Sequence, residues 1–263
     1  LYDAYLAELA NESEEVVCSI TGESSKTEDR TINLTMVGTG TGNGAEEAIT
    51  SCDGIRQHVF SGGGGGGDTR RVAIFAHAGA GKSWMMVQLK RKCSKVRKGA
   101  AVEWVPVFVA VQAIANALHV LFAGRAPADL AVAAAAALTI AWLIEHVVGP
   151  QMDPAIVAVL REAAASDRAV FVFDGVDEGG ALCEVIEDFI LEVGRQHRVV
   201  VTSRPEGVRQ RLYEQDGYLL LQLQPLTAAQ QQEMIDRRLT PDGAAHTFFA
   251  NLFAFIASRG QQR

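Results

Sequence analysis

The feature that most constrains this chain is a glycine-rich turn directly after a short apolar run. Residues 76–83 read Ala-His-Ala-Gly-Ala-Gly-Lys-Ser, and the apolar run before them begins at Arg71. A buried strand that ends in such a turn, followed by lysine and serine, is the layout of a phosphate-binding loop. The turn therefore predicts a site for a nucleoside triphosphate with Mg²⁺.

The loop has the groups that a triphosphate requires. Backbone N–H groups at a helix N-terminus, together with the helix dipole, attract anions, and glycines let the backbone approach the phosphates. Lys82 would reach the β- and γ-phosphates, and the Ser83 hydroxyl would bind Mg²⁺. The expected nucleotide-binding residues form one continuous run: Ala76, His77, Ala78, Gly79, Ala80, Gly81, Lys82, Ser83 and Trp84.

One position departs from the usual pattern G-x-x-x-x-G-K-[ST], because Ala76 stands where the first glycine is usual. Alanine is small, so we expect the loop to form. His77 is a loop residue without an assigned role. A glycine turn unrelated to phosphate is the alternative, but the strand before the turn and the helical stretch from Trp84 to Lys95 argue against it.

A second apolar run ends in carboxylates, since residues 170–178 read Val-Phe-Val-Phe-Asp-Gly-Val-Asp-Glu. We expect Asp174 to hold Mg²⁺ through a water molecule and Gly175 to pack closely beside the phosphates. Asp177 or Glu178 would orient or deprotonate an attacking water, and the sequence does not choose between them. The alternative is that both acids only cap the next helix, because carboxylates favour a helix N-terminus.

A third apolar run, Arg198-Val-Val-Val-Thr-Ser-Arg-Pro205, ends in polar residues and is stopped by proline. Ligands bind at the carboxyl ends of strands in open α/β sheets. Thr202, Ser203 and Arg204 are therefore expected at that edge, where Arg204 would sense the γ-phosphate. The alternative for Arg204 is an ordinary surface arginine.

These three pieces, in this order, resemble a NACHT domain, a STAND-type signalling NTPase related to AAA+ ATPases. The Asp-Gly-Val-Asp-Glu box at 174–178 is the most specific element, and Gly175 and Asp177 match the family pattern residue by residue. The resemblance covers roughly residues 69–240 and departs at Ala76. It implies ATP as the nucleotide, and a third strand that lies between the loop strand and the Asp174 strand, which would bring Arg204 and Glu178 to the same phosphate.

Composition and charge narrow the remaining classes. The chain has 263 residues, a net charge of −7 and four scattered cysteines without metal-binding spacing. An acidic balance argues against a general nucleic-acid binder, and the cysteines suit reduced thiols in a cytoplasmic protein. No signal peptide is visible. The uncharged stretch 130–144 is shorter than a membrane span needs, so we expect no membrane partner and a buried helix there.

The chain divides into three parts. Residues 1–68 form a partly ordered N-terminal segment that ends in the poly-glycine run 62–67, which is typical of a flexible linker. Residues 69–240 would be the NTPase domain, and 241–263 the start of a truncated helical region. The chain starts at Leu1 rather than methionine, so we expect a fragment of a longer protein.

Within residues 69–240, apolar runs alternate with helical patterns, which predicts a three-layer α/β fold around a mainly parallel, five-stranded sheet. The expected strands are 71–76, 105–111, 170–174, 198–203 and 217–223. The expected helices are 82–96, 128–147, 154–165, 182–193 and 228–239. In the helix at 182–193, one face is apolar and Glu184, Glu187, Asp188 and Glu192 are expected on the opposite, solvent face.

Three functions fit these patterns. The first is a slowly hydrolysing, ATP-binding switch or assembly module that binds ATP and ADP, with protein partners or self-association through flanking domains. The second is a P-loop phosphotransferase (a kinase) for a small molecule, which shares Lys82 and Ser83 and requires an acceptor pocket. The third is a non-catalytic nucleotide-binding module that uses its surface for partners.

Overall fold

The computed structural model describes residues 2–17, 24–26, 35–38, 51–60, 70–94, 104–238, 247–248 and 251–252. The poly-glycine run and nearly all of the expected C-terminal region lie outside the described residues. The domain boundaries expected from the sequence therefore stay a prediction. Elements before the poly-glycine run nevertheless contribute buried side chains to the same cores as the elements after it.

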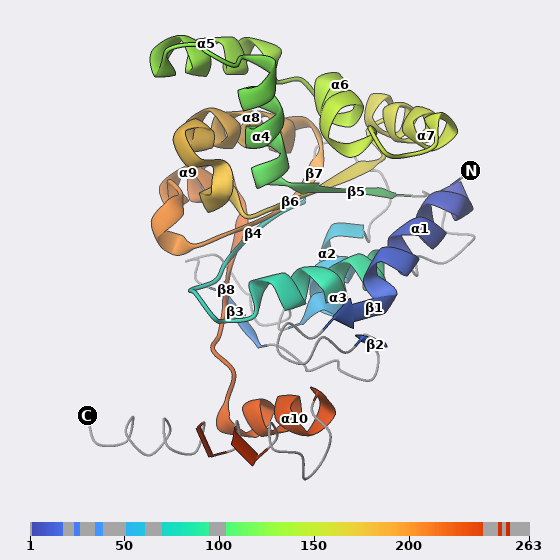
Figure 1. Cartoon of the computed structure of the whole chain (residues 1–263), viewed down its shortest axis with the longest axis vertical. Coiled ribbons are helices and arrows are strands. Elements are labelled where there is room, and N and C mark those ends of the chain that lie inside the picture. Colours follow the sequence, from blue (N-terminus) through green and yellow to red (C-terminus); the bar gives the residue numbers. More distant parts are fainter. Residues whose placement is uncertain are drawn as a thin grey trace.

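A mixed sheet forms the middle layer (Figure 1). Within the described residues it has six strands in the order β3-β8-β4-β7-β6-β5. The strands are β3 (Met36–Gly38), β4 (Arg71–Phe75), β5 (Val105–Ala110), β6 (Ala169–Asp174), β7 (Arg198–Ser203) and β8 (Leu219–Leu223). All neighbours are parallel except β3, which pairs antiparallel with β8. The expected mainly parallel α/β sheet is thus confirmed, with one more strand than predicted.

The order of the strands decides where their ends meet. β7 lies between β4 and β6, as the NACHT resemblance implied, and it pairs in parallel with both. The carboxyl ends of β4, β7 and β6 are therefore adjacent. The phosphate-loop segment follows β4, and the Arg204 loop follows β7. The carboxylate-rich segment lies at the end of β6.

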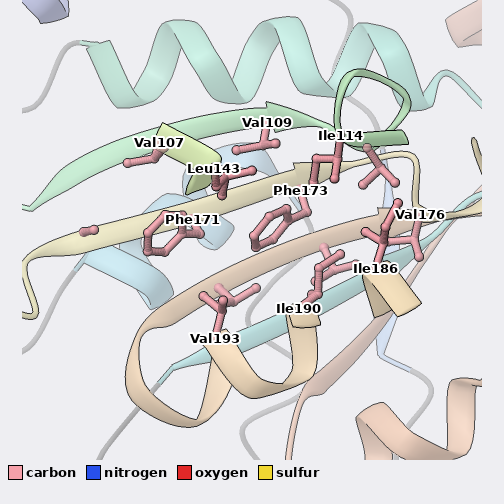
Figure 2. Close-up of a cluster of buried hydrophobic side chains, with 14 of the residues drawn as sticks. Val107, Val109, Ile114, Leu143, Phe171, Phe173, Val176, Ile186, Ile190 and Val193 are labelled. Atoms are coloured by element: carbon pink, nitrogen blue, oxygen red, sulfur yellow. The ribbon is translucent and has the colours of Figure 1, made fainter. Parts of the chain in front are cut away.

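The central strands β4, β6 and β7 are buried on both faces, so their side chains divide alternately between two cores. Ala73 and Phe75 face one core, whereas Val72 and Ile74 face the other. In the first core, β5 and β6 side chains meet Ile186, Ile190 and Val193 from the helix after the carboxylate segment (Figure 2). Continuous apolar strands of this kind are typical of a sheet covered by helices on both sides.

Helices form the two outer layers (Figure 1). One layer contains α4 (Val111–Leu121), α5 (Pro127–Ala137), α6 (Ile140–Leu143), α7 (Pro154–Ala165), α8 (Cys183–Gln196) and α9 (Gln210–Gln215). The other contains α2 (Cys52–Phe60) and α3 (Lys82–Ser94). α1 (Tyr2–Glu14) packs on α3 near the edge strand β5, and α10 (Ala228–Arg238) lies apart from the layers. A two-stranded ladder joins β1 (Glu15–Val17) and β2 (Ser24–Lys26).

The predicted helix 128–147 is wrong as a single element. α5 ends at Ala137, and Thr139 caps a new helix by accepting a hydrogen bond from the Trp142 N–H at 3.1 Å. α6 then runs into a π-helix, η3 (Ile144–Val148). α5 is also more exposed than expected, with Leu130 and Ala134 as its buried residues.

Among the described residues, no helix is by itself long and apolar enough to cross a bilayer. The pair Pro127–Ala137 and Ile140–Val148 reaches the length and composition only together, and it is bent by 97°.

Candidate functional site

The phosphate-loop segment turns sharply between β4 and α3. Gly79 and Gly81 have φ values of 79° and 94°, a region that favours glycine. The Ala80 N–H donates to the His77 carbonyl at 3.1 Å, which closes the turn. A Cβ placed on Gly79 would meet no heavy atom within 4 Å, so the space above the loop is open among the described residues. An open glycine turn at the start of a helix fits an anionic ligand.

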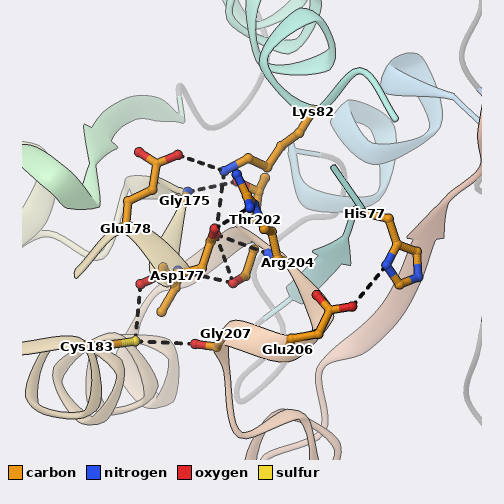
Figure 3. Close-up of polar contacts among 12 residues, drawn as sticks. His77, Lys82, Gly175, Asp177, Glu178, Cys183, Thr202, Arg204, Glu206 and Gly207 are labelled. Atoms are coloured by element: carbon orange, nitrogen blue, oxygen red, sulfur yellow. Dashed lines mark hydrogen bonds and ion pairs between the residues drawn. The ribbon is translucent and has the colours of Figure 1, made fainter. Parts of the chain in front are cut away.

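Lys82, the first residue of α3, lies among three carboxylates (Figure 3). Its Nζ is 3.7 Å from Asp174 Oδ1, 3.7 Å from Asp177 Oδ1 and 3.4 Å from Glu178 Oε1. The lysine side chain is only 13% exposed. The fold thus brings the loop lysine and all three predicted acids together, although the acids lie more than ninety positions away in sequence.

Asp174 ends β6 and is oriented by the neighbouring strand β7. Its Oδ1 accepts a hydrogen bond from the Thr202 hydroxyl at 2.5 Å. The next residue, Gly175, donates its N–H to the carbonyl and the hydroxyl oxygen of Thr202, both at 3.1 Å. Gly175 has a φ of 75°, and a Cβ there would lie 3.0 Å from Lys82 Nζ. The positive φ therefore favours glycine at this turn, and a Cβ there would displace the ends of the Lys82 and Glu178 side chains.

The two remaining acids differ in environment. Asp177 is 10% exposed, and its Oδ1 accepts from the Ser203 hydroxyl at 3.2 Å and the Arg204 N–H at 3.1 Å. Glu178 is 44% exposed, and its carboxylate lies beside Lys82. Gly175 is the N-cap of the next element, η4 (Val176–Leu182), and both acids lie in its first turn. Asp177 thus joins two loops, and Glu178 remains open to solvent.

Arg204 lies at the same edge of the sheet. Its Nε is 3.2 Å from Asp177 Oδ2, and its side chain is 56% exposed. His77, which had no predicted role, lies 3.2 Å from Glu206 Oε1 and so connects the phosphate-loop segment with the loop after β7. Ser83 is exposed in the first turn of α3, and Trp84 packs partly buried against the second core.

Sequence reasoning missed a set of residues that fixes the loop after β7. Glu187 was expected at the solvent face of α8, but it is 1% exposed and that expectation is wrong. It accepts hydrogen bonds from the Arg209 backbone N–H at 2.9 Å and from Nε at 2.5 Å. The second Arg209 amino group donates to Asp188 at 2.6 Å. The amphipathic pattern gave no signal for this pair, because it reports spacing and not the partner of a buried charge.

Cys183 also bridges the two loops. Its Sγ lies 3.3 Å from the Val176 carbonyl oxygen and 3.4 Å from that of Gly207. Gly207 belongs to the turn η5 (Pro205–Gly207) and abuts Asp177. Burial raises the pKa of the Cys183 thiol, and the nearby negative charges of Glu187 and Asp177 raise it further. The thiol is therefore protonated at neutral pH and acts as a hydrogen-bond donor.

Comparisons with known proteins find one structure with a similar arrangement and no family match. No protein-family model and no curated protein matches the sequence. Among solved structures, the fold is similar to that of the Aeropyrum pernix Orc1 protein in complex with DNA, with a TM-score of 0.41 and 16% sequence identity. The match covers 81% of this chain and 59% of that chain, so this chain spans less than two thirds of its neighbour's length.

The expectation that nucleic acid is not a partner is wrong. It rested on the acidic net charge of the whole chain, yet a structure with a similar fold is a complex with DNA. A net charge sums over the entire surface, so it does not exclude a local nucleic-acid contact.

Proposed function

We propose that this chain is an ATP-binding, slowly hydrolysing NTPase of NACHT type, located in the cytoplasm, that acts as a nucleotide-dependent switch or assembly module. One observation carries the proposal: Lys82, at the start of α3, lies within 3.7 Å of carboxylates from the adjacent segment after β6. A loop lysine beside an acidic strand end is the combination that phosphate and Mg²⁺ require together.

The residues present fit Mg²⁺ and a triphosphate. In the proposal, the backbone N–H groups of 76–84 and the Lys82 ammonium hold the phosphates. The Ser83 hydroxyl and Asp174 hold Mg²⁺, which supplies charge neutralisation at the phosphates when bound. Asp174 is suited to this role because the Thr202 hydrogen bond fixes its orientation.

We assign the orientation of the attacking water to Glu178 rather than Asp177. The two differ because Asp177 already accepts from Ser203 and Arg204, whereas Glu178 has only Lys82 beside it among the described residues. An acid that holds a water near the phosphate needs a free oxygen within hydrogen-bond reach. Arg204 would contact the γ-phosphate, and Asp177 would hold that arginine in position.

Switching would follow because the triphosphate and the carboxylates compete for Lys82 and Arg204. In the structure, Lys82 pairs with the carboxylates, and Arg204 pairs with Asp177. A bound triphosphate would draw both cations toward itself and so release the contacts between the loops after β6 and β7. Such a ligand shifts the population only by its difference in affinity for the two states. The partners that read this change would be other proteins or further copies of the chain, through flanking regions.

The test is a thermal-shift titration of the parent, Lys82→Ala and Lys92→Ala with ATP and Mg²⁺. Lys92 is the matched control, because it lies in the same helix but pairs with Asp53. ATP at a hundredfold excess over the dissociation constant should stabilise the parent and Lys92→Ala by about 2.7 kcal/mol. Lys82→Ala should show almost none of this shift, and an unchanged shift in Lys82→Ala would refute the site.

One observation favours the phosphotransferase as a second candidate. A cavity of about 540 Å³ is bordered by Ser83 and Asp174, which is the position that an acceptor would need. Product analysis separates the two functions, since a switch releases free phosphate and a phosphotransferase yields a phosphorylated small molecule. Failure of both ATP and ADP to bind at millimolar concentration would favour the non-catalytic module instead.

A further inference from the structure

Beside the proposed nucleotide site, the cavity of about 540 Å³ lies along the edge strand β5. α1 and α3, which pack together, supply part of its wall, and the π-helix η3 supplies another part through Val147 and Val148. Pockets for small ligands typically measure about 300–1,000 Å³. This cavity therefore has the size of a complete ligand site and not merely of a packing defect.

The wall of the cavity is mainly apolar and contains a few polar residues. Leu9, Met86, Phe108 and Val109 are among the apolar residues that line it. Apolar walls with a few convergent polar groups are typical of small-molecule sites. A π-helix is rare and is frequent at functional sites, so its place in this wall is a second, independent observation.

The polar residues of the wall indicate the charge of the ligand. Lys90 pairs with Glu12, and its Nζ lies 5.6 Å from the centre of the Phe108 ring. Because this pair is neutral overall, it gives no preference for a charged ligand. Ser83 and Asp174 also line the cavity. Among the described residues, the contacts of Asp174 use Oδ1, which leaves Oδ2 to accept a hydrogen bond.

We propose that this cavity binds a neutral, mainly apolar small molecule that carries one hydrogen-bond donor, with the donor directed to Asp174. Ala110 at the end of β5 and Asp174 at the end of β6 are register partners, so the pocket opens at the same sheet edge as the phosphate-loop segment. The proposal goes beyond the nucleotide switch and does not require hydrolysis. A ligand in the pocket would border Ser83 and Asp174, and would thereby lie next to the proposed Mg²⁺ position.

The probe is indole, a neutral aromatic molecule with one N–H donor, titrated into the whole chain by calorimetry. We expect saturable binding at one site with a dissociation constant of about 1 mM or tighter, which corresponds to about −4.1 kcal/mol. N-methylindole, which lacks the donor, should bind at least about fivefold more weakly. Equal binding of the two would overturn the assignment of Asp174 as the polar contact.

Two variants fill the pocket from different walls. Ala113→Trp acts from α4 and Val87→Trp from α3, and each should weaken indole binding about tenfold or more. Gln112→Trp is the matched control, because Gln112 is exposed on the same helix as Ala113. Circular dichroism melting checks that each variant is folded, and a second filling variant covers the case in which one fails to fold.

The outcomes separate this proposal from the nucleotide site. Lys82→Ala should lose its response to ATP and still bind indole as the parent does, whereas Ala113→Trp should lose indole and keep its ATP-dependent thermal shift. Absence of saturable indole binding to the parent would overturn the pocket. So would undiminished binding to a folded Ala113→Trp or Val87→Trp variant.

Discussion

Replacing Gly207 with alanine tests how closely the two loops of the site are packed. A Cβ on Gly207 would lie 2.3 Å from Asp177 Cβ and 3.0 Å from Asp177 Cα. Ordinary contact begins at 3.4 Å, so one loop would have to move by roughly 1 Å. Asp177 cannot move that far without straining its hydrogen bonds to Ser203 and Arg204.

The expected loss follows from these contacts. Inserting a methyl group into a closely packed site usually costs about 1–3 kcal/mol. Gly207 is not among the glycines with positive φ, so alanine would not strain the backbone itself. We expect Gly207→Ala to lower the free energy of unfolding by about 1–3 kcal/mol, and each kcal/mol to lower Tm by roughly 2–4 °C in a domain of this size.

The assay is urea unfolding followed by circular dichroism, with Gly179→Ala as the matched control. Gly179 lies in η4 near the same site, but a Cβ there would be 3.4 Å from Cys183 Cβ, which is ordinary contact. The control should stay within about 0.5 kcal/mol of the parent. A Gly207→Ala variant as stable as the parent, or a control that loses as much stability, would refute the inferred packing.

Two further variants test buried charges. Glu187→Gln should lower the free energy of unfolding by about 1–3 kcal/mol in urea titrations, because Arg209 then loses its buried ionic partner and keeps, among the described residues, only the exposed carboxylate of Asp188. A double-mutant cycle with Arg209→Met that finds no coupling would contradict this. Burial lowers the pKa of His197 below its usual 6.5, and the charge of Asp167 opposes part of this shift. The unfolded chain therefore binds a proton more readily than the folded one. The contribution of His197 to stability is present above about pH 6.5 and is lost as pH falls. His197→Phe should therefore flatten the pH dependence of unfolding between pH 7 and 5, and a slope equal to that of the parent would show that His197 does not contribute.

Much of the fold was predictable because its strands are long apolar runs with distinct ends. The predicted strands 71–76, 170–174 and 198–203 are observed as β4, β6 and β7, with bounds that differ by at most one residue. The NACHT resemblance also predicted the position of β7 between the other two. The predicted helix 154–165 is confirmed as α7, and Asp153 caps it by accepting a hydrogen bond from the Ala155 N–H at 2.8 Å.

Other elements gave no local signal. α4 was not predicted, because β5 passes into it at Ala110 without a polar cap and both elements are apolar. The break at Thr139 was missed because the stretch around it is uncharged throughout. α2 was missed because it is short and contains Gly54. For α2 and α4, packing against the sheet decides the structure rather than the local pattern.

The candidate site was predictable only in part for a similar reason. Lys82 and the acids at 174–178 stand in recognisable motifs, and the roles assigned to them stay predictions. The Glu187–Arg209 pair joins residues 22 positions apart in sequence, without a recognisable spacing. Its partners are determined by how α8 packs against the loop after β7. A single sequence therefore indicates the chemistry of the site but not the contacts that hold its loops.

The most direct test of the central claim is calorimetric titration of ATP into the parent and Asp174→Asn, each with Mg²⁺ and with a chelator. If Lys82, Ser83 and Asp174 form one Mg²⁺–triphosphate site, the parent should bind ATP at least about tenfold more tightly with Mg²⁺, a difference of about 1.4 kcal/mol. Asp174→Asn should lose most of this gain. Equal affinity with and without Mg²⁺ in the parent, or no ATP binding at millimolar concentration, would contradict the proposed site.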